Sequence, residues 1–393
     1  MTEGNAPDTD ETVASTTPTE LKARIDSGES VFILDARSEG DFDEWHIGGE
    51  NVEIVNHPYF DLLDGIPASL HTELPDDQRI TVLCAKGGSS ELVAEHLKEA
   101  GYEVDHLARG MKGWARIYEY QEIATDTDAT VAQYRRPSSG CLGYLVVSEG
   151  EAAVIDPLRA FATEYVQDAR TLGSDLTYAL DTHVHADHIS GIRDVAAETD
   201  ATAVLPAAAA DRGVEYEQSY RTISDGETLT VGDVEIEAIA TPGHTTGMTA
   251  YKVGDVLFTG DGLFTESVAR PDLEDPEAAK EAARTLYESL QEQVLPLSDD
   301  TIVAPAHFSD SATPNDDGTY TATLGDLVDR MDALTMDEGE FVEFIVADMP
   351  PQPANYEEII ATNLGQQAPA DEQAFELELG PNNCAASEEA LTN

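Results

Sequence analysis

Residues 179–191 read ALDTHVHADHISG, and this stretch indicates the fold of the larger part of the chain. It places three histidines and an aspartate within six residues, after an apolar strand pattern and before a helical one. Side chains in a loop between a strand and a helix can converge on one point, and imidazole with carboxylate suits zinc or non-heme iron. The stretch therefore predicts a metal site built on His183, His185, Asp187 and His188.

Three further candidate ligands end apolar runs later in the chain. His244 lies in ATPGHTTG, Asp261 in FTGD and His307 in VAPAH. Each follows a strand pattern, so we expect the strand ends to bring them to the same place. Seven candidate ligands in such positions are hard to explain by packing alone, and the sequence predicts that all seven surround the metal.

The pattern of apolar runs divides the chain into two folded parts. Residues 16–122 alternate apolar runs with helical patterns, which predicts a small α/β domain around a parallel sheet. Residues 130–345 are rich in strands and turns with helices between them, which predicts a layered αββα sandwich, closed by residues 346–393. Residues 1–15 read as a flexible acidic tail and residues 123–129 as a polar linker.

The composition is strongly acidic along the whole chain. Asp and Glu number 78 against 21 Lys and Arg, giving a formal charge of −57. Self-repulsion of this size excludes nucleic acid as a partner. The even spread of the negative charge along the chain suggests a protein of an extreme halophile.

No run approaches the roughly 20 apolar residues of a membrane-spanning helix, and the N-terminus lacks a signal region. We therefore expect a cytoplasmic protein without a membrane partner.

His183, His185, Asp187 and His188 match the HxHxDH motif of the metallo-β-lactamase superfamily. The sequence resembles that superfamily over residues 130 to about 345. In its hydrolases two metals share all seven ligands, and a bridging hydroxide attacks an ester or amide carbonyl. Hydrolysis with two zinc ions is therefore one activity that the resemblance implies.

Persulfide dioxygenases are a branch of the same superfamily that holds one iron(II) per chain. The residues matching its ligands are His183, His244 and Asp261. Two histidines and one carboxylate leave three open positions for substrate sulfur and dioxygen. On this interpretation four motif residues do not bind iron but surround and orient its ligands: His185, Asp187, His188 and His307.

Two flanking segments favour the dioxygenase branch. GDGLFTESVARPDLE resembles the stretch after the metal aspartate in persulfide dioxygenases, where an arginine matching Arg270 lies near the substrate. PPQPANYEEIIATNLG resembles the closing segment of members of that branch that are fused to a rhodanese domain. The resemblance also implies a homodimer.

The N-terminal part resembles a single rhodanese domain across residues 18 to about 122. The segments that carry the resemblance are ILDARSEGDFDEWHIGGENV, VLCAKGGSSELVAEHLKEAGY and LARGMKGW. It implies that Cys84 carries a persulfide on a loop whose backbone N–H groups surround the sulfur. Gly87 and Gly88 let the backbone wrap closely, and the helix N-terminus that follows favours thiolate. A nucleophilic sulfur, loaded by a sulfane-sulfur donor, is expected at Cys84.

The Cys84 loop departs from the common rhodanese pattern, which has an arginine five residues after the cysteine. Ser89 stands there, and Lys86 replaces only the charge because a lysine lacks the bidentate fork. The expected substrate-binding residues of this loop are Lys86, Gly87, Gly88 and Ser89. Whether thiosulfate is the donor stays open.

Cys141 and Cys384 have no setting comparable to that of Cys84, and the sequence assigns them no role. Three cysteines that lie far apart do not predict a disulfide framework.

The sequence leaves three functions open. The leading one is oxygenation of a low-molecular-weight thiol persulfide to thiol and sulfite, joined to sulfur transfer through Cys84. The second is a glyoxalase II-like thioester hydrolase with two zinc ions, although Arg330 is the only basic side chain after His307 to hold glutathione carboxylates. The third is a non-enzymatic sulfur carrier or redox sensor, against which the intact ligand set argues.

Overall fold

The computed structural model describes residues 13–63, 65–309, 312–347 and 349–386. The chain divides into two compact units, residues 1–117 and residues 118–393. No helix in the described part of the chain is both long enough and apolar enough to cross a membrane.

The first unit is built around one parallel sheet. Its strands are β1 (Ala14–Thr16), β2 (Val31–Asp35), β3 (Val52–Asn56), β4 (Ile80–Leu83) and β5 (Val104–Leu107). They lie in the order β1-β5-β4-β2-β3, and every neighbouring pair is parallel. All residues of β2 and β4 are buried, as expected for the central strands of a sheet covered on both faces.

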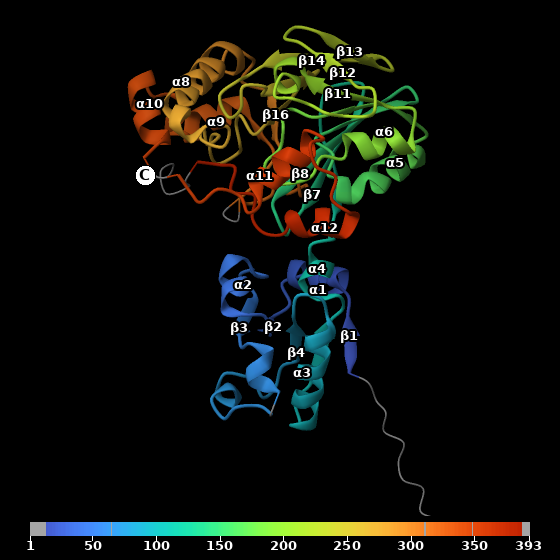
Figure 1. Cartoon of the computed structure of the whole chain (residues 1–393), viewed down its shortest axis with the longest axis vertical. Helices are drawn as coiled ribbons and strands as arrows, with labels where there is room; N and C mark the ends of the chain where they lie inside the picture. Colours follow the sequence, from blue (N-terminus) through green and yellow to red (C-terminus); the bar gives the residue numbers. More distant parts are fainter. Residues whose placement is uncertain (1–12, 64, 310–311, 348, 387–393) are drawn as a thin grey trace, which may run out of the picture. The chain divides into compact units, whose positions relative to one another are not determined.

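Helices cover both faces of this sheet (Figure 1). They are α1 (Pro18–Asp26), α2 (Glu39–Glu44), α3 (Gly88–Glu99) and α4 (Gly110–Trp114). Val93 of α3 packs on one face, while Leu21 of α1 and Met111 of α4 pack on the other. The chain enters α1 through a capping box, in which Thr17 and Glu20 satisfy each other's backbone N–H groups. This arrangement confirms the predicted α/β domain.

The structure differs from the sequence prediction in where the N-terminal tail ends and where the linker between the units lies. Val13 is buried and Ala14 begins β1, which pairs with β5, so the tail cannot extend to residue 15. Residues 1–12 lie outside the described residues. The division between the units falls after Ile117, and the segment predicted as a linker, residues 123–129, connects two strands of the second unit.

The second unit contains two sheets. The strands of the larger sheet are β6 (Glu119–Ile123), β7 (Thr130–Arg136), β8 (Cys141–Ser148), β9 (Glu151–Ile155), β10 (Asp175–Leu180), β11 (Thr202–Pro206) and β12 (Arg221–Ile223). They lie in sequence order from β6 to β12. The pairs from β6 to β9 are antiparallel and those from β9 to β12 are parallel.

The strands of the smaller sheet also follow one another in chain order. They are β13 (Thr228–Val231), β14 (Val234–Ala240), β15 (Thr249–Val253), β16 (Val256–Gly260), β17 (Ile302–Pro305) and β18 (Ala322–Thr323). The pair β16–β17 is parallel, and the other pairs are antiparallel. The parallel pair brings two strand ends to the same edge, which is where Asp261 and His307 follow.

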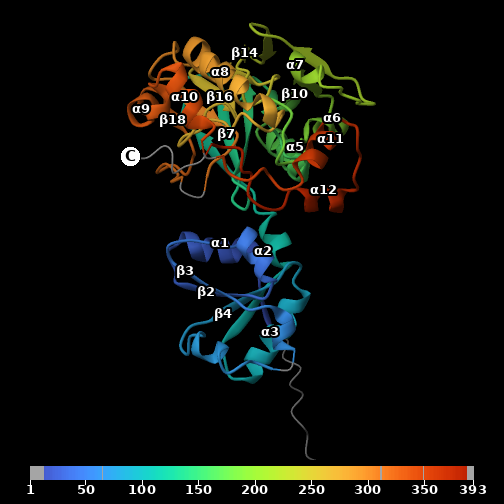
Figure 2. The same ribbon diagram turned by 60° about the vertical axis from the view of Figure 1, so that its left-hand side comes forward.

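Apolar side chains from both sheets form the core between them. Tyr144 of the larger sheet packs against Phe258 of the smaller one, with ring centroids 4.8 Å apart. Helices α5 (Ala162–Thr171) and α6 (Ile192–Glu198) pack on the outer face of the larger sheet. Helices α8 (Ala279–Ser289), α9 (Leu324–Arg330) and α10 (Glu338–Ile345) cover the smaller sheet, and they group together in Figures 1 and 2. The predicted αββα sandwich is confirmed.

Two helices of the C-terminal part, α11 (Tyr356–Asn363) and α12 (Asp371–Leu377), are joined to the rest of the second unit by buried polar groups. Glu378 is 4% exposed, accepts a bond from Arg136 Nη1 at 3.0 Å and accepts another from the Ile189 N–H at 3.0 Å. Asn363 donates to the carbonyl oxygens of His185 and His188, at 3.0 Å and 2.8 Å. The C-terminal part therefore holds the HxHxDH loop in place.

Candidate metal centre

Three ligand atoms from three strand ends converge at one point. His183 follows β10, His244 follows β14 and Asp261 follows β16. The Nε2 atoms of both histidines lie 3.6 Å from Asp261 Oδ2, and all three side chains are buried. None of these three atoms has a hydrogen-bond partner in the described part of the chain. Buried polar atoms without partners are costly, so this geometry fits a bound metal ion.

The other atoms of these side chains hold the ligand atoms in position. His244 Nδ1 lies 2.9 Å from the carbonyl oxygen of Arg270. A carbonyl oxygen only accepts, so Nδ1 carries the hydrogen and Nε2 keeps its lone pair for a metal. Burial is the largest influence on both histidines and lowers the pKa of His183 and of His244. Both rings are therefore held in the neutral form that a metal ligand requires.

Asp261 is fixed by His307. Its Oδ1 lies 2.5 Å from His307 Nδ1, while its Oδ2 faces the two ligand histidines. Burial raises the pKa of the Asp261 carboxyl, but the neighbouring histidines, His307 foremost, lower it more. The carboxylate is therefore ionised, with one oxygen anchored and the other available.

His185 lies in an adjoining acidic cluster. Its Nε2 is 3.1 Å from Asp156 Oδ1 and 3.7 Å from Asp181 Oδ1, and its Nδ1 has no partner among the described residues. Within the same part of the chain, its ligand atoms do not come within 4.8 Å of those of both His183 and His244. The structure therefore brings together the ligand atoms of the three residues predicted for iron. The His185 ring packs against that of His183, with centroids 4.3 Å apart, but its nitrogen groups with Asp156 and Asp181 instead.

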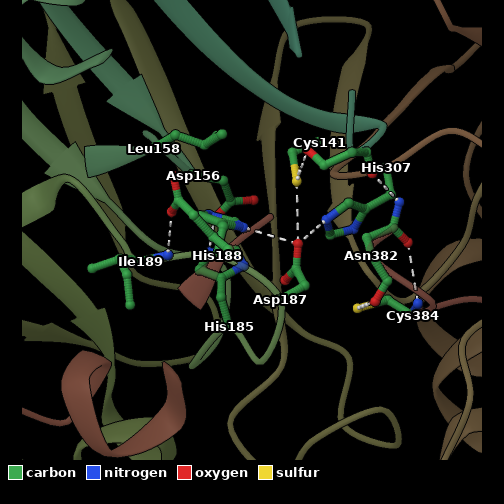
Figure 3. Close-up of polar contacts among 12 residues, drawn as sticks. Cys141, Asp156, Leu158, His185, Asp187, His188, Ile189, His307, Asn382 and Cys384 are labelled. Atoms are coloured by element: carbon green, nitrogen blue, oxygen red, sulfur yellow. Dashed lines mark hydrogen bonds and ion pairs between the residues drawn. The ribbon is translucent and has the colours of Figure 1, made fainter. Parts of the chain in front are cut away.

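The remaining motif residues bond to one another around Asp187 Oδ2 (Figure 3). His307 Nε2 lies 2.7 Å from this oxygen and His188 Nδ1 lies 3.1 Å from it. The Cys141 thiol donates to the same oxygen at 3.2 Å. Both ring nitrogens of His307 thus face carboxylates, one on Asp187 and one on Asp261. In this arrangement His307 has no lone pair free for a second metal.

Arg270, which the sequence predicted near the substrate, is held by hydrogen bonds within the protein. Its side chain is 1% exposed, and its Nε and Nη2 donate to the Asp272 carboxylate at 2.7 Å and 2.9 Å. Its Nη1 donates to the carbonyl oxygens of Pro351 and Asn383. With these four hydrogen bonds the guanidinium positions the C-terminal segment, while the Arg270 carbonyl contacts His244. The place of Arg270 near the substrate stays a prediction.

Sequence reasoning missed two cysteines that the fold brings to the site. Cys141 groups with Asp187, His188 and His307, with ligand atoms within 4.8 Å of one another. Cys384 groups in the same way with Asp187, Asp261 and His307. Burial raises the pKa of both thiols, but nearby histidines leave the pKa of Cys141 lowered overall, while that of Cys384 is well raised. Neither cysteine lies in a motif, so only the three-dimensional fold identifies them.

The Cys84 site of the first unit has the predicted loop geometry. Cys84 follows β4, and its Sγ accepts a hydrogen bond from the Gly87 N–H at 3.1 Å. Gly87 has a φ of +97°, and a Cβ there would lie 2.9 Å from the backbone nitrogen of Arg109, so the turn requires glycine. Ser90 Oγ lies 3.4 Å from the sulfur and donates to the Gly87 carbonyl at 3.0 Å.

Of the residues predicted around this sulfur, Gly87 contributes a direct contact through its backbone. Gly88 is the first residue of α3. Lys86 is exposed and Ser89 is partly exposed. Ser90 is the serine whose oxygen accepts a hydrogen bond from the Cys84 thiol. The role of Ser89 in binding substrate stays a prediction.

Two family models match the chain, one for each unit. The model of the metallo-beta-lactamase superfamily matches residues 138–307, and that of the rhodanese-like domain matches residues 17–117. The chain is 30% identical over 192 residues to a mouse protein named persulfide dioxygenase ETHE1, mitochondrial, covering 48% of this chain and 71% of the mouse protein. It is 34% identical over 163 residues to the human protein of the same name, covering 40% of this chain and 59% of that protein.

A hydrolase and two solved structures are also similar. A hydroxyacylglutathione hydrolase of Rhodospirillum rubrum is 36% identical over 125 residues, covering 31% of this chain and 46% of that protein. A metallo-beta-lactamase from Staphylococcus aureus has a TM-score of 0.55 at 26% identity, covering 61% of this chain and 73% of that one. ETHE1 from Myxococcus xanthus has a TM-score of 0.51 at 27% identity, covering 60% of this chain and 98% of that one.

Proposed function

Because this chain belongs to the metallo-beta-lactamase superfamily and has a rhodanese-like domain at residues 17–117, we propose that it oxygenates a low-molecular-weight thiol persulfide to thiol and sulfite. The observation that carries the proposal is the convergence of His183 Nε2, His244 Nε2 and Asp261 Oδ2, all buried and without partners among the described residues. Two histidines and one carboxylate form the ligand set of non-heme iron oxygenases.

The three ligands would hold one iron(II), which when bound supplies open positions for the persulfide sulfur and dioxygen. The chain's own residues prepare these ligands. The Arg270 carbonyl orients His244, and His307 holds one oxygen of Asp261 so that the other faces the centre. Full burial of the three side chains excludes bulk water, which protects a reactive sulfur species from side reactions.

A dizinc thioester hydrolase is the alternative, because all seven candidate ligands are present and hydroxyacylglutathione hydrolases are among the relatives. Two contacts favour the single-metal site. Both ring nitrogens of His307 face carboxylates, and the His185 nitrogen groups with Asp156 and Asp181 although its ring packs on that of His183. Arg330, the only basic residue after His307, donates to the Thr265 carbonyl at 2.9 Å, which occupies part of its guanidinium.

The rhodanese-like domain is proposed to transfer sulfane sulfur through Cys84. The Gly87 N–H donates to the Cys84 sulfur, and the Cys84 thiol donates to Ser90 Oγ, so two hydrogen bonds hold the sulfur in a fixed place at the start of the loop. A sulfurtransferase can load sulfur onto a thiol acceptor, and the product is then a substrate for the second unit. The two activities therefore share an intermediate.

Metal analysis of anaerobically purified protein, combined with oxygen uptake on glutathione persulfide in high salt, tests the proposal. We expect one iron per chain, and oxygen uptake with formation of sulfite. His183→Ala should abolish oxygen uptake, whereas His71→Ala should retain it, because His71 lies in the first unit and bonds to Tyr102. Two zinc ions per chain with thioester hydrolysis and no oxygen uptake would contradict the proposal.

A further inference from the structure

The fold places a thiol beside the proposed iron ligands, in a position that the proposed oxygenation does not use. Cys141 begins β8, and the backbone fixes its place: Leu142 N–H donates to the Ala306 carbonyl at 2.7 Å, and Phe308 N–H donates to the Gly140 carbonyl at 3.0 Å. Cys141 therefore lies directly beside His307. The strand pairing, and not a flexible loop, sets the position of the sulfur.

The Cys141 thiol makes two hydrogen bonds. It accepts a hydrogen bond from Ser139 Oγ at 3.0 Å and donates its own proton to Asp187 Oδ2 at 3.2 Å. A carboxylate that receives the thiol proton is the arrangement of a nucleophile with its base. The same carboxylate oxygen contacts His307 (Figure 3). His307 in turn contacts the proposed iron ligand Asp261.

Two polar atoms of this cluster have no partner in the described part of the chain. They are Asp187 Oδ1 and His188 Nε2, and both residues are more than nine-tenths buried. Buried polar atoms in native proteins nearly always have a hydrogen-bond partner. Two such atoms without a partner therefore indicate that another group binds next to them. Cys141, Asp187, His188 and His307 thus form a site with a nucleophile, a base and unused polar atoms.

We propose that Cys141 accepts the sulfane sulfur of a thiol persulfide and carries it as a protein-bound persulfide beside the metal centre. The thiol sulfur attacks the outer sulfur of R–S–S–H, so that one S–S bond forms and one breaks. The electron pair of the broken bond leaves with R–S⁻. The Cys141 proton passes to Asp187 Oδ2 and from there to R–S⁻, giving Cys–S–SH and RSH. No oxidant or reductant is needed.

The inference rests on the proposed function only for the class of substrate. Cys141 and the proposed ligand Asp261 belong to one hydrogen-bonded cluster, because His307 contacts both Asp187 and Asp261. A persulfide carries one S–H donor, as the thiol does, but holds it one sulfur atom farther from the backbone. Asp187 Oδ1, an acceptor without a donor among the described residues, is a partner for that S–H which the thiol does not use.

Peptide mapping after anaerobic treatment with glutathione persulfide tests the inference on the full-length wild-type protein. Without dioxygen the sulfur cannot be consumed, and alkylation after denaturation traps each cysteine in its state. We expect one added sulfur on the Cys141 peptide. Cys84→Ser should leave this labelling intact, because the transfer is direct, and Asp187→Asn should slow it by about tenfold or more.

Cys384 provides the matched control within the same protein. It is equally buried and lies near Asp187, but its thiol donates to the Asn382 carbonyl at 3.4 Å. We expect it to stay unmodified. Sulfur on Cys84 alone, or equal labelling of Cys141 and Cys384, would overturn the inference. Oxygen uptake on the same substrate separates the two proposals: uptake with unlabelled Cys141 rejects this inference alone, and labelling without uptake rejects the proposed function alone.

Discussion

His307 Nδ1 lies 2.5 Å from Asp261 Oδ1. The other oxygen of the same carboxylate faces His183 and His244. The second nitrogen of His307 lies 2.7 Å from Asp187 Oδ2. His307 therefore links two carboxylates, and we assign it to holding Asp261 instead of binding metal.

His307→Ala should weaken metal binding without abolishing it. Removal of a residue that orients a metal ligand lowers affinity by about ten- to a hundredfold, whereas loss of a ligand does more. Competition with a chelator measures this affinity. His307→Asn, whose amide can still donate to Asp261, should lose less affinity than His307→Ala. Complete loss of metal in both variants would show that His307 is itself a ligand.

Arg270→Met should destabilise the second unit. It leaves the buried Asp272 carboxylate without its bidentate partner, which costs about 3 kcal/mol, and frees the carbonyl groups of Pro351 and Asn383. Arg284→Ala is the control, because its ion pair with Glu281 lies at the surface and contributes at most about 1 kcal/mol. Denaturant unfolding at one fixed salt concentration compares the two. Equal stability of both variants would contradict this role of Arg270.

Gly110→Ala should abolish sulfur transfer by the first unit. Gly110 has a φ of +55°, and a Cβ there would lie 2.0 Å from the carbonyl oxygen of Cys84, so the Cys84 loop must move. Gly40→Ala, where a Cβ would meet nothing within 4 Å, should leave transfer unchanged. A cyanide-acceptor assay of sulfur transfer measures the effect. Retained activity in Gly110→Ala would mean that the loop position does not control Cys84.

Ser90→Ala should slow sulfur transfer by up to about tenfold. It removes the oxygen that accepts the hydrogen bond of the Cys84 thiol at 3.4 Å and so orients the sulfur, and a neutral hydrogen bond contributes about 0.5 to 1.5 kcal/mol. The KM for the acceptor should change less than kcat, because the contact is made to the sulfur and not to the acceptor. If Ser89→Ala has the larger effect, the assignment to Ser90 is wrong.

The sequence was sufficient to predict the layers of both units and seven candidate ligands. Buried strands appear as apolar runs, and a polar residue that ends such a run lies at the end of its strand, as His183, His244 and Asp261 do. Local patterns did not single out these three residues, which only the resemblance to persulfide dioxygenases selected.

The surroundings of the ligands could not be predicted in the same way. Cys141 meets Asp187 across 46 residues of sequence, and Arg270 meets Asn383 across 113. Such contacts depend on how the sheets and the C-terminal segment pack, and single residues such as Cys141 carry no periodic signal. The partners of Arg270 were missed for the same reason, since two of them are backbone carbonyl groups that no sequence motif marks.

The metal content of two histidine variants tests whether His183, His244 and Asp261 hold a single metal. We predict one iron per chain in the wild type, none in His183→Ala, and close to one in His185→Ala, because the His185 nitrogen bonds to Asp156 and does not group with the three ligand atoms. Two metals per chain in the wild type, with one lost in each variant, would contradict the single-metal site.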